Sequence, residues 1–395
     1  MSRARQWPML LVLLLAADAL CACITLPRSS FTASEQAAAS PAGFSHIRYA
    51  QDDPALADML GAALRPGAGG VVNTLAISGG GANGAYAAGV LYGWSKTGQR
   101  PRFQLVTGVS AGALAAPFAF LGPGWDEPLK QSYTGPRVHH LLQARVLLRW
   151  LTPGFYRKGP LQDLVRTYVT DDLMRAVAAE QAKGRRLLVA TTDLDTEQLV
   201  VWDMGAIAAR PGPESRDLFA QVLIASASVP GIFSPTMIEV QADGRRFAEM
   251  HVDGQADSAF FAIPQTLLLG RRPEAPHFQH HLYVLVNGQV NSLFAVTPRA
   301  TIPVLSRTID AATKASVRSS LIATLQFCQR NGCDLNVSVL PSSVKDDPLD
   351  FSAAHIESLF SAGEAAALAG QAWTDAMPAL SATPDAAQPQ INAPR

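Results

Sequence analysis

Two glycine-punctuated junctions, each between a short apolar run and a helical run, constrain the fold of this chain most. The first is NTLAISGGGANGAYAAGVLYGWSK, from Asn73, and the second is FQLVTGVSAGALAAPFAFLG, from Phe103. In each, an apolar run of strand length meets glycines and then a stretch of helical length. Glycine costs about 1 kcal/mol in a helix interior relative to alanine, so three consecutive glycines at a helix entrance indicate a need for bare backbone. The junctions predict two strand–turn–helix units.

Further apolar runs alternate with helical stretches along residues 71–376. Expected strands are RRLLVATTDL, QLVVWDM, RFAEMHVDG and HLYVLVNG, and expected helices lie near 160–183, 215–226, 308–325 and 355–376. This alternation predicts one α/β domain over 71–376, with a mostly parallel central sheet flanked by helices. The composition permits such a core, because 48% of the 395 residues are hydrophobic and only 16% are charged.

The first 22 residues have the layout of a secretory signal peptide, with two arginines, the apolar run MLLVLLLAA and then small residues. The apolar run is short for a membrane span. The tetrad Leu20-Cys21-Ala22-Cys23 resembles a bacterial lipobox, from which Cys21 is a mild departure. The resemblance implies acylation of Cys23 and an exported lipoprotein, with Ile24 favouring the outer membrane and its periplasmic face. An ordinary signal peptide with two incidental cysteines is the alternative.

The segments outside the expected domain have a different composition. Residues 23–70 are rich in Ala, Ser, Pro and Gly, which predicts a flexible tether with one short helix at DPALADMLGAAL. The lipobox resemblance implies that this tether is lipidated at Cys23. The polar, proline-bearing residues 377–395 predict a disordered tail. Lys+Arg and Asp+Glu both number 32, and no basic run is present, which argues against a nucleic-acid partner.

The two remaining cysteines, Cys328 and Cys333, lie close together in CQRNGC. In an exported protein, such a pair predicts a small disulfide loop. Free thiols are the alternative. A metal site would need more ligands, and no histidine is close in sequence, so no metal is expected there.

Ser110 stands at the centre of the second junction, in Gly108-Val109-Ser110-Ala111-Gly112. This is a GxSxG sequence between an expected strand and an expected helix, the context that a nucleophile elbow requires. Flanking glycines make room for the sharp turn, and the serine faces the positive end of the helix dipole. The sequence therefore predicts Ser110 as a nucleophile, with a tight packing turn and an incidental serine as the alternative.

The first junction supplies what an acyl-transfer enzyme needs next, which is a set of N–H donors for a tetrahedral oxyanion. The candidates are Gly79, Gly80 and Gly81, followed by Asn83 and Gly84. Phosphate binding is the rival interpretation, because Gly79, Gly81 and Gly84 satisfy the GxGxxG spacing. No acidic residue ends a following strand at the required distance, and no P-loop sequence is present, so a nucleotide site is disfavoured.

A serine nucleophile needs a base, and none of the eight histidines stands in a convincing triad setting. His251 is the best placed, near the end of an expected strand. Asp253 follows it and is succeeded by Gly254 and Gln255. A carboxylate released at a strand end by a glycine turn is a candidate to face the elbow, although Asp-Gly is also an ordinary turn.

Together, these motifs resemble those of bacterial patatin-like phospholipases that carry a lipoprotein signal. GGGANG matches that family's glycine-rich loop, GVSAG its elbow and DGQ its later Asp-Gly motif, and SASVPGIFSP resembles the stretch between them. The likeness covers about residues 73–260, and more weakly the chain to about 375. It implies a three-layer patatin-like α/β fold, a Ser110–Asp253 dyad without histidine, an oxyanion hole from Gly79–Gly81, and no metal or cofactor.

The resemblance also implies the activity, which is hydrolysis of acyl esters of membrane lipids. Two residues depart from the family pattern. Asn83 stands where Arg or Lys is frequent, and Gln255 replaces a small residue, so we expect weaker electrostatic help and a changed aim of Asp253. A non-catalytic lipid-binding lipoprotein on the same fold is the alternative. The apolar stretches LAAPFAFLGPGW and VLLRWLTPGFY (146–156) are candidates for an acyl-channel lining and for a lid or membrane-contact loop.

Overall fold

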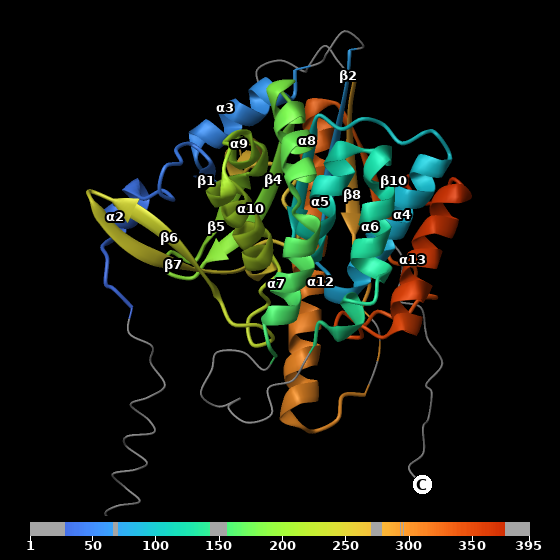
Figure 1. The fold of residues 1–395 in the computed structure, drawn as a ribbon. Helices are drawn as coiled ribbons and strands as arrows, with labels where there is room; N and C mark the ends of the chain where they lie inside the picture. Colours follow the sequence, from blue (N-terminus) through green and yellow to red (C-terminus); the bar gives the residue numbers. More distant parts are fainter. Residues whose placement is uncertain are drawn as a thin grey trace, which may run out of the picture.

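The computed structural model describes residues 28–65, 70–142, 156–269, 279–292, 294 and 296–375. The predicted signal peptide, the acylation site Cys23, the disordered tail and nearly all of the candidate lid lie outside these residues. Figure 1 shows helices gathered on both sides of one sheet. Among the described residues, no helix combines the length and the apolar character that crossing a bilayer requires.

Ten strands in the described part of the chain form a mixed sheet in the order β1-β5-β4-β3-β2-β8-β9-β10, with β7 pairing β4 and β6 pairing β7. The central strands β4, β3, β2, β8 and β9 are parallel, and β5, β7 and β10 run against the others. The predicted parallel centre is confirmed, with antiparallel strands added at its margins. The strands are β1 (Arg48–Ala50), β2 (Val71–Ile77), β3 (Leu105–Val109), β4 (Arg186–Asp193), β5 (Gln198–Asp203), β6 (Thr236–Ala242), β7 (Arg245–Asp253), β8 (Gln279–Val286), β9 (Cys333–Val339) and β10 (Thr374–Asp375).

Helices cover both faces of this sheet, and successive strand residues alternate between the two cores because side chains in a strand point to opposite faces. Leu285 of β8 belongs to the larger core, whereas Val284 belongs to the core under α12. Leu56 of α3 packs in a third cluster, against β3, β4 and β5. The helices are α2 (Ala33–Ala38), α3 (Pro54–Ala63), α4 (Gly84–Lys96), α5 (Ala111–Leu121), α6 (Asp126–Thr134), α7 (Gly159–Tyr168), α8 (Asp171–Ala182), α9 (Met204–Ala209), α10 (Pro213–Ser226), α11 (Gln265–Leu269), α12 (Thr301–Asn331) and α13 (Ala353–Leu368).

Residues 28–65 fall within the stretch that we expected to be a flexible tether, and they are instead built into the fold. β1 pairs with the edge strand β5, and α2 lies beside the β6–β7 hairpin (Figure 1). Phe31 stacks on Phe247, with ring centroids 4.4 Å apart. The one helix predicted here is confirmed as α3, which Asp53 caps. Composition misled the prediction because the partners that order this segment lie far along the chain.

Cys328 and Cys333 form a disulfide bond, with Cα atoms 4.5 Å apart. The bond joins the last turn of α12 to the first residue of β9. Since α12 belongs to the outer layer and β9 to the sheet, the bridge fastens one layer to the other.

Candidate active site

Ser110 lies between the end of β3 and the start of α5, in the middle of the sheet. Its φ of 55° and ψ of −124° are rare for a residue with a side chain, as at a nucleophile elbow. Gly112 makes the turn possible, since a Cβ there would lie 2.3 Å from the carbonyl oxygen of Ile77. The N–H of Ser110 donates to Ser226 Oγ at 2.9 Å, so Ser226 of α10 holds the elbow in place.

Asp253, the last residue of β7, reaches Ser110 because β7 pairs with β4, next to β3. Ser110 Oγ donates to Asp253 Oδ2 at 2.5 Å, and both side chains are buried. The N–H of Gln255 donates to the other oxygen, Asp253 Oδ1, at 2.9 Å. Thr192 of β4 donates to the carbonyl oxygen of Asp253 at 3.1 Å. The strand pairing and the following turn therefore fix the direction of the carboxylate.

Burial raises the pKa of Asp253 to about 7, and the hydrogen bonds from Ser110 and Gln255 oppose that rise. Desolvation disfavours a buried charge, and both hydrogen-bond donors are neutral groups. A carboxylate with a pKa near 7 accepts a proton at neutral pH far more readily than one with the ordinary pKa of about 3.9. The environment of Asp253 suits a general base.

The glycine-rich loop follows β2 and lies against the elbow. Three of its five candidate donors do not fit that role, because their N–H groups already have acceptors. Gly79 donates to the carbonyl oxygen of Ala259 at 3.2 Å, and Asn83 to that of Gly80 at 3.0 Å. Gly84 donates to carbonyl oxygens of the preceding 3₁₀ turn. Of the five candidates, Gly80 and Gly81 are therefore the better placed as donors.

The N–H groups of Gly80 and Gly81 do not donate to any acceptor in the part of the chain that the structure describes. Gly81 has a φ of 55°, and a Cβ there would lie 2.3 Å from the carbonyl oxygen of Pro348. Only glycine allows this conformation and this close approach together. Gly81 and Ser110 line the same pocket, so one of these two unpaired donors lies beside the nucleophile.

Asn83 and Gln255, the two departures from the family pattern, both have defined contacts. Asn83 is buried, and its Nδ2 donates to Asp346 Oδ1 at 2.6 Å, so its side chain is committed elsewhere. Asp346 also pairs with Lys314, with Nζ and Oδ2 3.3 Å apart. The Gln255 side chain covers Gly79, whose Cβ, if it had one, would lie 2.2 Å from Gln255 Oε1. Asp253 still reaches Ser110, so Gln255 does not prevent the turn.

A pocket opens beside Ser110. Leu114 contributes to its wall from α5, within the stretch that the sequence suggested as a channel lining. Most of the other lining residues are also apolar, and they include Leu141, Leu161, Leu164, Ile232, Phe233, Leu349 and Ile356. The nucleophile therefore faces a space suited to hydrocarbon.

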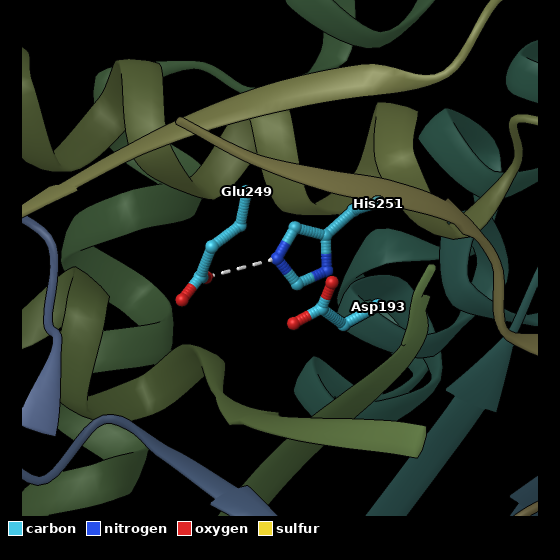
Figure 2. Close-up of side chains that lie close together, drawn as sticks. All are labelled: Asp193, Glu249 and His251. Atoms are coloured by element: carbon cyan, nitrogen blue, oxygen red, sulfur yellow. Dashed lines mark hydrogen bonds and ion pairs between the residues drawn. The ribbon is translucent and has the colours of Figure 1, made fainter. Parts of the chain in front are cut away.

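His251, the histidine that the sequence placed best, belongs to a separate buried cluster with Asp193 and Glu249 (Figure 2). Its ring lies between the two carboxylates, with Nε2 3.2 Å from Glu249 Oε2. Its Nδ1 lies 3.0 Å from Thr191 Oγ1. Both ring nitrogens are thus engaged away from Ser110, so His251 does not serve as its base.

The cluster has the residue types of a metal site, and the donor atoms of Asp193, Glu249 and His251 all lie within 4.8 Å of one another. However, Arg48 already binds both oxygens of Glu249, and Gln36 Nε2 donates to Asp193 Oδ2 at 3.0 Å. To bind the Glu249 carboxylate, a divalent cation would have to displace the Arg48 guanidinium from it. The cluster therefore fits a structural hydrogen-bond network better than a metal centre.

Comparison with known proteins found similarity over part of the chain. Residues 75–259 match the model of the patatin-like phospholipases. The chain is similar to VipD from Legionella pneumophila, with a TM-score of 0.40, 13% identity, and 77% of this chain and 68% of VipD covered. It is also similar to the type III effector ExoU, with a TM-score of 0.32, 14% identity, and 76% and 53% covered. A search of curated proteins found no match. The stretch from residue 75 to 259 therefore constitutes a patatin-like phospholipase domain, and Ser110 and Asp253 both lie within it.

Proposed function

We propose that this chain is a serine hydrolase of acyl esters in membrane lipids, of the phospholipase A or lysophospholipase type. The observation that carries the proposal is the 2.5 Å hydrogen bond from Ser110 Oγ to Asp253 Oδ2 at the edge of an apolar pocket. The match of residues 75–259 to the patatin-like phospholipases supports lipid acyl hydrolysis at the level of the family.

In the proposed reaction, Asp253 accepts the proton of Ser110 while Oγ attacks the ester carbonyl carbon. The negative charge that develops on the carbonyl oxygen is received by the N–H groups of Gly80 and Gly81 and by the N-terminus of α5. Asp253 then gives its proton to the departing alcohol, which leaves an acyl group on Ser110. Water attacks this ester, Asp253 accepts a proton from the water, and the fatty acid is released as the proton returns to Ser110.

The test compares the native chain with Ser110→Ala and Asp253→Asn on phospholipid vesicles and on a p-nitrophenyl ester. We expect both variants to lose at least about four orders of magnitude in kcat, as removal of a nucleophile or its base does. A fluorophosphonate should label the native chain and not Ser110→Ala. Fatty-acid release that persists in Ser110→Ala would overturn the assignment. If the native chain binds vesicle lipid but shows no hydrolysis that depends on Ser110, the non-catalytic, lipid-binding alternative would be favoured.

We propose further that the chain is exported and anchored in the outer membrane through an acylated Cys23. The lipobox-like tetrad that ends at Cys23 supports this. Several acyl chains on one cysteine would hold the protein far more firmly than one chain. Cys23→Ala should abolish incorporation of labelled palmitate and release the protein from the membrane fraction. Equal labelling of the native chain and Cys23→Ala would contradict the proposal.

A further inference from the structure

A second, smaller pocket lies next to the pocket beside Ser110. We call it the distal pocket. Leu114, Ser132 and Leu164 line both cavities, so the two share a boundary. Two of these three boundary residues are leucines, whose side chains have alternative staggered rotamers. A long ligand that enters beside Ser110 therefore has a continuation available.

Two helices lead from the first cavity into the distal pocket. On α5, Leu114 lies about 6 Å and Phe118 about 12 Å along the helix axis from Ser110, at 1.5 Å per residue. Leu114 lines both cavities, and Phe118 lines only the distal one. On α7, Leu161 lines only the first cavity and Val165 only the distal one. On both helices, the residues that line the distal pocket come after those that line the first pocket. The distal pocket is therefore farther from Ser110.

The wall of the distal pocket suits hydrocarbon rather than a polar headgroup. The aliphatic lining includes Val165, Val169 and Leu173. Ser132 Oγ donates to a backbone carbonyl oxygen of its own helix at 2.7 Å, so its hydroxyl proton is already committed. Phe118 and Tyr168 contribute rings that meet edge to face, with centroids 6.2 Å apart. A buried polar group of a ligand would meet few partners here, which is unfavourable.

From this geometry, we propose that the distal pocket receives the far end of the substrate's acyl chain and makes the enzyme selective for long, unbranched acyl esters. The proposal rests on the hydrolase activity proposed above. Each additional methylene that enters the pocket should raise kcat/KM about fourfold, the gain expected from removing one CH₂ from water. The gain should end where the chain fills the pocket.

The test uses Val165→Phe, which fills the distal pocket, beside Arg166→Phe, which adds the same ring on the exposed side of α7. The readout is kcat/KM for p-nitrophenyl butyrate, octanoate and palmitate, with thermal unfolding as a check of folding. We expect the palmitate-to-butyrate ratio to fall at least tenfold in Val165→Phe and to keep its native value in Arg166→Phe. If kcat/KM depends on acyl-chain length in the same way in Val165→Phe and in the native chain, the proposal is overturned.

A binding measurement tests the acyl-site proposal for the distal pocket independently of the proposed hydrolase activity. If the native chain cleaves none of the esters, the proposed function fails, and the pocket is then judged with Ser110→Ala protein and the fluorescent fatty acid cis-parinaric acid. Adding Val165→Phe to Ser110→Ala should weaken binding at least tenfold, and adding Arg166→Phe should leave it unchanged. Equal binding by the two double variants would overturn the distal pocket as an acyl site.

Discussion

Asp253 combines complete burial with neutral hydrogen-bond donors on both of its oxygens, and this combination has a consequence for the pH dependence of the reaction. Burial raises the pKa of Asp253 to about 7, and only the ionised carboxylate accepts the proton of Ser110. We therefore expect kcat/KM to rise about tenfold per pH unit below this value and to level off above it. A profile of kcat/KM against pH with short-chain esters checks this.

His251→Gln is the matched control for this profile, because an unperturbed histidine also titrates near pH 6.5. Since both ring nitrogens of His251 are engaged with Glu249 and Thr191, its replacement should leave the midpoint where it is. Loss of the midpoint in His251→Gln would show that His251 is the titrating base. A native midpoint near pH 4 would show that Asp253 is hydrated rather than buried.

The burial of Asp253 also lowers the stability of the folded chain at neutral and alkaline pH. The pKa of Asp253, raised to about 7 in the folded chain by burial, lies above the unfolded value, so its contribution to stability is fully present below about pH 4 and is lost as pH rises through about 7. At about pH 8, the ionised carboxylate therefore lowers the free energy of unfolding by roughly 4 kcal/mol.

Asp253→Asn removes this charge while keeping a similar shape. We expect the variant to be inactive and yet more stable than the native chain by about 2–4 kcal/mol near pH 8, with the difference vanishing near pH 4. Denaturant unfolding at the two pH values measures this. An Asp253→Asn variant that is less stable than the native chain near pH 8 would mean that the carboxylate contributes more through its contacts than it loses through burial.

At this scale, the sequence predicted the residues that carry chemical groups and missed those that act through backbone contacts. Ser110 and Asp253 each stand in a motif with a physical purpose, and the structure brings them together. The N–H of Gly79 is taken up by the carbonyl oxygen of Ala259, a distant residue, which no local pattern reveals. Ser226 was also missed, although it lies in SASVPGIFSP, the stretch that resembles the family.

Between elements, the buried network around His251 fastens the N-terminal elements to β7, which carries Asp253, and to its neighbour β4. Arg48 comes from β1, Gln36 from α2, and Glu249 from β7. Burial alone would raise the pKa of Glu249, but hydrogen bonds from His251 and Arg48 outweigh it and lower that pKa. The carboxylate therefore stays ionised in the interior only while these partners are present.

Removal of Arg48 should leave Glu249 as a buried charge with too little compensation. We expect Arg48→Met to destabilise the fold by about 3 kcal/mol, which is typical when one partner of a buried ion pair is lost. Arg48→Met combined with Glu249→Gln should recover most of this, because no unpaired charge then remains. Denaturant unfolding of the two single variants and the double variant forms the cycle, and additive effects would contradict a direct pairing.

Elements with a clear period could be predicted from the sequence, and those that depend on a partner could not. The strands and helices of the parallel centre follow from alternating apolar and helical runs. β6 alternates buried and exposed residues throughout, so its period-two signal was present in TMIEVQA and was overlooked. β1 has only three residues, and its pairing with β5 gives it a structure that its own sequence does not specify.

For the molecule as a whole, composition predicted a large buried core, but it carried no information about cavities. The two adjoining cavities depend on how α5, α7 and α10 meet, which is a property of the assembled layers. The two cavities could therefore be found only in the structure and not in the sequence.

The balance of charge over the whole chain bears on how it meets a lipid surface. Its 32 basic and 32 acidic side chains give a net charge of zero, and no basic run provides a patch for anionic headgroups. Attraction to an anionic bilayer amounts to about 1 kcal/mol per surface Lys or Arg and is screened by salt. We therefore expect hydrolysis of zwitterionic and anionic vesicles at rates within about threefold of each other, and little change between about 0.05 and 0.5 M salt. Initial rates of fatty-acid release on both vesicle types check this. A steep fall with salt on anionic vesicles alone would mean that basic side chains gather on the face that meets the lipid, despite the zero total.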